Sequence, residues 1–248
     1  MLKSKKHYFS CMELLMIIAV FVIGSALVFP VLGSAQTSAK SVSCQDNLQI
    51  CIKAALMYAN EHEGKAVLKY GDSSTGKLLM AMACGTSVGN TGVKSAKRLS
   101  VKNIICPDTT VLPKKVTWHF SEFYAVPYGL FNNNYSLTPY EKPEGFYMLR
   151  KWPNADVAVD FKKLQYTDSA VIYAEAWNAK NKKAHSTYGL AKNENSKLDF
   201  RHDGKNNMAF ADGHVAGKEL AFVTEQREAS GVSGKWYVYN SKRESVGL

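Results

Sequence analysis

The feature that most constrains this chain is a continuous stretch near its start that is first apolar and then amphipathic. Residues 14–33 are almost all apolar, and Glu13 is the single charged residue between positions 9 and 33. About 20 apolar residues, each rising ~1.5 Å, suffice to cross a bilayer core of ~30 Å. We therefore expect a helix whose first half is transmembrane, with a kink at Pro30, because proline removes one backbone hydrogen bond.

The helical pattern continues beyond the apolar run. Apolar residues recur at steps of three and four, which is helix spacing: Ala39, Val42, Leu48, Cys51, Ile52, Ala55, Leu56 and Ala59. Glycine readily adopts the left-handed conformation that ends helices, so we expect the helix to end at Glu63-Gly64. The predicted organisation is a basic leader (1–8), a transmembrane half-helix (9–33), an amphipathic half-helix (34–64) and a β-rich globular head (65–248).

The first residues also carry a family resemblance. A short leader with three lysines precedes Phe9, Glu13 follows four residues later, and an Ile/Val-rich run leads to Pro30. This start resembles that of type IV pilins and type II secretion pseudopilins. The resemblance implies that a prepilin peptidase cuts between Tyr8 and Phe9 and methylates the new amino terminus, although the family has Gly where this chain has Tyr8.

The same resemblance implies a role for Glu13 in assembly. A carboxylate in hydrocarbon costs at least ~2.5 kcal/mol and seeks a partner. In the family, that partner is the amino terminus of a neighbouring subunit, so the Glu13 pair would set the axial register of a filament. The alternative is that Glu13 lies at the membrane interface and reaches water.

A cleaved secretory signal is the competing interpretation of the N-terminal segment. Gly33-Ser34-Ala35 before Gln36 has the small-x-small form of a cleavage site. The apolar run, however, exceeds the usual 7–15 residues of a signal peptide, and the helical pattern continues past Gln36. We favour a retained single-pass anchor in the inner membrane. The basic leader would stay cytoplasmic, and the head would be periplasmic or extracellular.

The head reads as a series of short β-type runs separated by turn residues. Such runs suit an antiparallel sheet with one face on a helix, which makes the expected fold α+β and pilin-like. The expected strands are 101–106, 116–120, 124–130, 146–150, 157–161, 170–174 and 236–239. Short helices are expected at 77–84 and 218–228, and a polar loop at 176–195.

Two Asp-Gly pairs, Asp203-Gly204 and Asp212-Gly213, mark the C-terminal part. Asp-Gly between alternating residues favours type I′ hairpin turns, so we expect a three-stranded meander of 198–201, 207–211 and 214–217. His202, nine residues and then Asp212-Gly213 also resembles the pattern that names a large group of prepilin-like proteins. Three further segments of the chain, 44–48, 57–60 and 105–107, resemble sequence landmarks of the same group.

His202, Asp212 and His214 are the candidate metal ligands or catalytic residues. Imidazole and carboxylate suit transition metals, and carboxylates alone suit calcium. The predicted meander, however, separates His202 from Asp212 by a strand of roughly 17 Å. We therefore predict that His202, Asp212, Gly213 and His214 are structural turn residues, with His202 bonding a loop backbone. We predict no enzyme activity, cofactor or metal, with calcium in the head as the open alternative.

The five cysteines allow disulfides in an exported head. Cys11 falls in the apolar run. Cys44 and Cys51 lie two helical turns apart, about 10 Å, which is too far for them to bridge each other. Each would need Cys84 or Cys106, and free buried thiols remain the equal alternative.

The net charge of +10 comes from scattered lysines rather than from a basic run interleaved with aromatics, so we predict no nucleic-acid partner. The function we expect is a pilin-like structural subunit whose partners are the membrane, prepilin peptidase and like subunits of a pilus or pseudopilus filament. Two alternatives remain. One is an exported enzyme or metal-dependent binding protein with a site at His202 and Asp212, and the other is an anchored protein that never polymerises.

Overall fold

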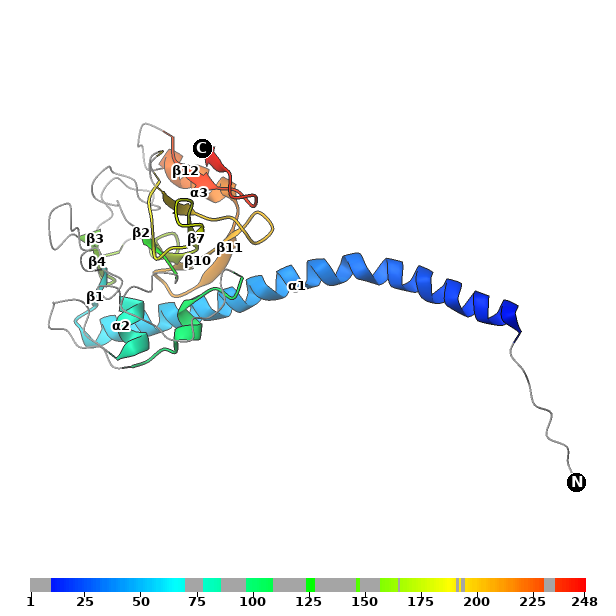
Figure 1. Cartoon of the computed structure of the whole chain (residues 1–248). Coiled ribbons are helices and arrows are strands. Elements are labelled where there is room, and N and C mark those ends of the chain that lie inside the picture. The colour runs from blue at the N-terminus through cyan, green and yellow to red at the C-terminus, as the bar shows by residue number, and fades with distance from the viewer. Residues whose placement is uncertain are drawn as a thin grey trace, which may run out of the picture. The chain divides into compact units, whose positions relative to one another are not determined.

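The computed structural model describes residues 10–69, 78–85, 97–108, 124–127, 146–147, 157–164, 166–190, 192, 195–229 and 235–248, without the side chains of 26–35, 69, 126–127, 146–147, 157 and 187. The chain divides into two compact units, Met1–Ala39 and Lys40–Leu248. Helix α1, Cys11–Glu61, contributes to both (Figure 1). The predicted leader and processing site, Tyr8 and Phe9, lie outside the described residues.

Helix α1 is 51 residues long and runs through Pro30, where the kink remains a prediction. Its end is as predicted. Glu63 and Gly64 both have positive φ, 60° and 90°, and the Gly64 N–H donates to the Ala59 carbonyl at 2.7 Å. This left-handed pair satisfies a terminal carbonyl and turns the chain into the first strand.

The prediction of a transmembrane half-helix, and with it a single-pass inner-membrane location, is wrong. Within the described residues, no helix combines the length and the apolar character that a membrane span requires. From Gln36 the helix turns polar, with Thr37, Ser38, Lys40 and Ser41.

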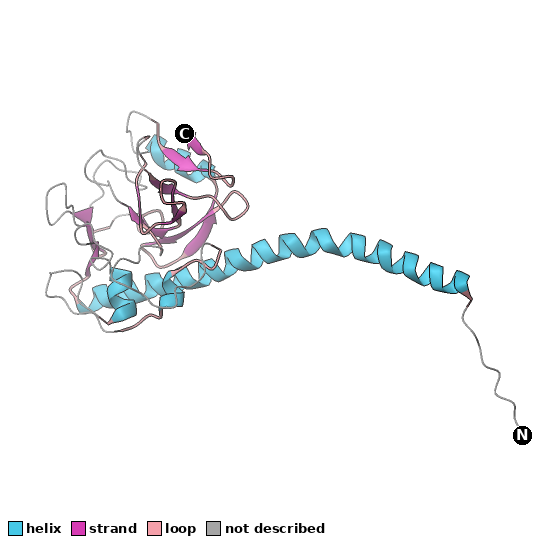
Figure 2. Cartoon of the chain, viewed as in Figure 1, coloured by secondary structure: helices cyan, strands magenta, loops and turns pink. Residues whose placement is uncertain are grey.

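In the part of the globular unit that the structure describes, short strands are accompanied by further helical segments (Figure 2). The helical segments are α2 (Leu78–Cys84), the 3₁₀ helix η2 (Val101–Ile104) and α3 (Leu220–Ala229). The strands are β1 (Lys65–Lys69), β2 (Val126–Pro127), β3 (Phe146–Tyr147), β4 (Val157–Asp160), β5 (Val171–Ala174), β6 (Ala176–Asn178), β7 (Lys183–Ala184), β8 (Thr187–Tyr188), β9 (Ser196–Leu198), β10 (Asn206–Phe210), β11 (Val215–Lys218), β12 (Tyr237–Tyr239) and β13 (Ser245–Gly247).

The predicted pilin-like head built on one antiparallel sheet is also wrong. In the described residues the strands form five small sheets, ordered β1-β4-β3, β11-β10-β5, β12-β13, β2-β8 and β7-β6-β9. The β2–β8 pair is parallel. Strands of two to five residues cannot extend far across a sheet, and alternation in sequence does not specify which strands become neighbours.

Several element assignments change with this architecture. The segment 176–195, predicted as a loop, contains β6, β7 and β8. The segment 101–106, predicted as a strand, begins with η2, in which the Asn103 side chain accepts from the Ser100 N–H at 3.2 Å. The predicted strand 116–120 lies outside the described residues.

The predicted meander is only half correct. Strands β10 and β11 form the expected antiparallel hairpin, but the other edge of β10 pairs with β5, and β9 pairs with β6. Asp203 and Gly204 both have positive φ, 53° and 77°, as a type I′ turn requires. At the second pair Gly213 alone is left-handed, with φ 94°, and Ala211, Asp212 and Gly213 form a three-residue loop instead.

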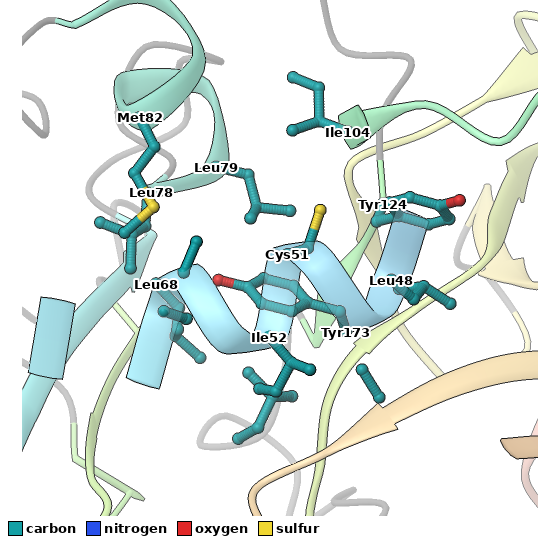
Figure 3. Close-up of a cluster of buried hydrophobic side chains, with 14 of the residues drawn as sticks. Leu48, Cys51, Ile52, Leu68, Leu78, Leu79, Met82, Ile104, Tyr124 and Tyr173 are labelled. Atoms are coloured by element: carbon teal, nitrogen blue, oxygen red, sulfur yellow. The ribbon is translucent and has the colours of Figure 1, made fainter. Parts of the chain in front are cut away.

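The core of the globular unit is built around the second half of α1. Buried α1 side chains at helical spacing include Leu48, Cys51, Ile52 and Ala55, each fully inaccessible. Figure 3 shows side chains of α2 and β1 gathered around this segment, together with Tyr124 and Tyr173. A second cluster of buried apolar residues includes Phe200, Met208, Phe210 and Trp236.

The two turn glycines make a matched stability test. An added Cβ at Gly213 would lie 3.1 Å from Leu56 Cδ1 of α1, whereas one at Gly204 meets nothing within 4 Å. Both substitutions to Ala carry a left-handed backbone cost of about 1 kcal/mol. We expect Gly213→Ala to lower the free energy of unfolding, measured by denaturant titration, by more than Gly204→Ala does. Equal losses would contradict the close packing of this turn on α1.

Candidate functional site

The candidate site is a group of polar side chains in the interior of the globular unit. This buried polar cluster comprises Glu175, Asp199, His202, Asn206 and Asn207, each 2% exposed or less. Glu175 lies between β5 and β6, Asp199 and His202 follow β9, and the two asparagines begin β10. Buried polar groups are costly unless they hydrogen-bond, so the partners of these residues define the site.

Asn206 holds the backbone of two neighbouring segments. Its Nδ2 donates to the carbonyl of Glu175 at 2.7 Å and to that of Asp199 at 3.0 Å. Its Oδ1 accepts from the Glu175 N–H at 3.3 Å. The amide of one side chain thereby satisfies three backbone groups, which fixes the carboxylate of Glu175 at the centre of the cluster.

The Glu175 carboxylate contacts His202. His202 Nε2 lies 2.9 Å from Glu175 Oε1, and Glu175 Oε2 accepts from the Asn207 N–H at 3.3 Å. The prediction that the His202 side chain bonds a loop backbone is therefore wrong. On its other side, His202 Nδ1 lies 3.9 Å from Asp108 Oδ2 and has no hydrogen-bond partner among the described residues.

A disulfide borders the cluster. Cys44 of α1 bonds Cys106, 62 residues later, which selects one of the pairings that the sequence left open, while Cys51 and Cys84 are free thiols. Closing a loop of this length stabilises the fold by about 4 kcal/mol on entropic grounds. Cys106 Sγ lies 3.5 Å from His202 Nε2, so the disulfide contacts the Glu175–His202 pair.

The neighbours of Cys44 on α1 make polar contacts with the same region. Gln45 Nε2 donates to Asn207 Oδ1 at 2.9 Å, and Asn47 Nδ2 donates to the carbonyls of Lys102 and Ile105, each at 3.2 Å. Tyr124 donates its hydroxyl to the Cys44 carbonyl at 2.9 Å, and burial raises the pKa of Tyr124 well above its usual value. The segment 44–48 thus acts as a hydrogen-bonding motif of the core.

Four residues have the chemistry to hold a metal. One ligand atom each from Cys44, Cys106, Glu175 and His202 lies within 4.8 Å of the others, and all four residues are buried. In the disulfide form the two sulfurs are not thiolates, and the thiolate is the form that ligates metals. This leaves His202 and Glu175 as the available ligands while the disulfide is intact.

The structure does not bring His202 together with Asp212. The two residues lie at opposite ends of β10, a strand of five residues and roughly 17 Å. Asp212 Oδ1 accepts from the His214 N–H at 3.0 Å and lies 2.7 Å from His214 Nδ1. The Gly213 carbonyl accepts from Gln49 Nε2 of α1 at 2.7 Å.

A buried ion-pair group lies beside the cluster. Asp199 Oδ2 lies 2.9 Å from Arg201 Nε and 3.5 Å from Arg243 Nε, and the Arg243 guanidinium stacks 3.5 Å over the Trp177 ring. Burial raises the pKa of Asp199, and the two arginines oppose that rise only in part. The carboxylate is therefore held where its charged form is poorly stabilised.

Sequence reasoning missed Glu175 and Asn206. Glu175 is the single charged residue between Ala170 and Ala179, a run with four consecutive buried residues in β5. A lone carboxylate inside such a run is the signal that could have marked it, because a buried charge needs a partner.

Comparison with known proteins adds no assignment: neither a family model, nor a curated protein, nor a solved structure matches the chain. The functional argument therefore depends on the chain's own chemistry.

The raised pKa of Asp199 predicts a pH-dependent stability. Between the ordinary carboxyl value near 3.9 and the higher folded value, the folded chain holds a proton that the unfolded chain has lost. The contribution of Asp199 to stability is therefore largest below that window and declines as pH rises through it. Asp199→Asn removes this titration, so we expect the stability of the native chain relative to Asp199→Asn, measured by denaturant titration, to fall from pH 3 to pH 6. A constant or rising difference would contradict the assignment.

Proposed function

We propose that the protein is a structural subunit, not an enzyme, and that it assembles into a filament through the first half of α1. The observation that carries this proposal is the exposure of every described side chain from Ser10 to Ser25. The large apolar ones are 43–74% exposed: Met12, Leu14, Leu15, Met16, Ile17, Ile18, Val20, Phe21, Val22 and Ile23.

A helix that is apolar on all sides is normally buried. Large exposed apolar surfaces mark interaction sites, since covering them removes apolar area from water. The covering partner we propose is the same segment of further copies, because helices of identical character can pack side by side. This is the kind of assembly that the resemblance to type IV pilins and type II secretion pseudopilins implies.

Glu13 gives such an assembly a register. It is the single charged residue among residues 11–25, and its Oε2 accepts from the Ser10 N–H at 2.8 Å, which caps the start of α1. A carboxylate buried between copies is tolerated only opposite a donor or a cation. A neighbouring helix therefore has few positions along α1 at which it can dock.

The interior of the globular unit supports a structural role. The buried polar cluster directs its hydrogen bonds to backbone and side-chain atoms of the same unit, as Asn206 does with Glu175 and Asp199. The hydrogen bonds of Asn206 satisfy three buried backbone groups, and bonds of this kind favour one packing of the unit. The group at Asp212 and His214 is likewise explained by its turn.

The proposal predicts that self-association depends on the first half of α1. The test variant is Phe21→Glu, in which the replaced side chain is 74% exposed. The control is Tyr166→Glu, which changes a side chain of the globular unit that is 43% exposed. A charge buried in an apolar interface costs several kcal/mol, so we expect Phe21→Glu to weaken self-association at least about tenfold in light scattering and sedimentation. Tyr166→Glu should associate like the native chain.

At a concentration at which the native chain is monomeric, circular dichroism and the unfolding midpoint should be unchanged in Phe21→Glu, because the Phe21 side chain is exposed. A native full-length chain that stays monomeric at micromolar concentration would overturn the proposal. So would equal association of Phe21→Glu and the native chain.

A further inference from the structure

Four metal-ligating groups from distant parts of the sequence meet inside the globular unit. Cys44 lies on α1, Cys106 follows η2, Glu175 joins β5 to β6, and His202 lies in the turn before β10. Their ligand atoms lie within 4.8 Å of one another, and all four residues are buried. Disulfide stabilisation alone requires the two cysteines but not a carboxylate and an imidazole beside them.

We propose that reduction of the Cys44–Cys106 disulfide converts this cluster into a binding site for Zn²⁺. Two thiolates, one imidazole and one carboxylate form a ligand set of the type that zinc takes in tetrahedral sites. The inference is independent of the proposed assembly, because it uses no residue of the first half of α1.

The present geometry matches a tetrahedral site at one of its edges, and two other edges must lengthen. With Zn–S near 2.3 Å and Zn–N near 2.05 Å, a tetrahedral S···N edge is about 3.6 Å. Cys106 Sγ and His202 Nε2 are 3.5 Å apart. The edge between His202 Nε2 and Glu175 Oε1, now 2.9 Å, must open to about 3.4 Å. The two sulfurs, once no longer bonded, must separate to about 3.8 Å.

The chemistry of the conversion balances with a dithiol as the reductant. The S–S bond accepts two electrons and two protons from the dithiol, which itself becomes a disulfide, and Cys44 and Cys106 become thiols. Binding of Zn²⁺ then displaces both thiol protons to solvent, and His202 ligates as the neutral imidazole.

A carboxylate also lies near the second ring nitrogen of His202. When Nε2 ligates the metal, the ring proton resides on Nδ1, which lies 3.9 Å from Asp108 Oδ2. Nδ1 has no hydrogen-bond partner among the described residues. A carboxylate behind a ligating imidazole orients the ring and raises its basicity. Asp108, two residues after Cys106, is therefore a positioning residue of the site.

The consequence is that zinc replaces the covalent link between α1 and the segment after η2. In the oxidised chain the disulfide holds these segments together, and in the reduced chain the metal would do so. The globular unit thus has one connection at this point in either redox state.

The test uses the full-length chain, oxidised or reduced with a phosphine, and Co²⁺ as the spectroscopic probe. We expect the reduced chain to bind one Co²⁺ with thiolate-to-cobalt charge-transfer absorption and tetrahedral d–d bands, and to release it when Zn²⁺ is added. The oxidised chain should show neither band. Zn²⁺ should raise the melting temperature of the reduced chain and leave that of the oxidised chain unchanged.

Two variants separate this site from other thiols. His202→Gln should weaken the affinity of the reduced chain for Zn²⁺ at least about tenfold, whereas Cys84→Ser, which removes an exposed free thiol, should leave it unchanged. If His202→Gln does not fold, the difference in metal binding between the oxidised and the reduced native chain still tests the proposal. Absence of stoichiometric binding by the reduced chain, or equal binding by the oxidised chain, would overturn the proposal.

Discussion

The globular unit depends on the burial of one face of a helix that is far longer than the unit requires. From Cys44 to Ala59, α1 places a stripe of fully buried side chains against α2, β1 and β5. Each buried Leu or Ile contributes about 1.5–3 kcal/mol relative to an exposed one. Short strands in small sheets gain little stability from their own pairing, so β1 and β5 depend on this helix, whereas strands such as β9 and β12 pack on the second cluster.

Polar contacts fix how the chain is arranged around α1. Hydrophobic burial is not directional, whereas the hydrogen bonds of Gln45, Asn47 and Gln49 require acceptors at particular positions. Together with the Cys44–Cys106 disulfide they tie α1 to the start of β10, the segment after η2 and the loop after β10. The buried apolar side chains of α1 therefore supply stability, and the polar side chains beside them fix where the other segments lie along the helix.

The sequence predicted what local chemistry determines. Helical spacing and the Glu63-Gly64 pair located the end of α1, and Asp203-Gly204 located a tight turn. Prediction from the sequence failed for strand pairing, because strands that follow each other along the chain are not always neighbours in a sheet. Strand β10 pairs with β5 rather than β9, because pairing depends on packing that short strands do not encode. The same limit hid the site, since Glu175, His202 and Cys106 lie far apart in sequence and meet only in the folded unit.

The central claim concerns the apolar surfaces of the two halves of α1. The globular unit of the same chain covers that of the second half, whereas that of the first half requires other copies to cover it. Amide hydrogen exchange of the dilute full-length chain tests this most directly, since exchange rates report local opening. The account predicts that residues 44–59 exchange as slowly as β5 and β10, while residues 11–25 exchange much faster. Exchange of residues 44–59 as rapid as that of residues 11–25 would contradict it.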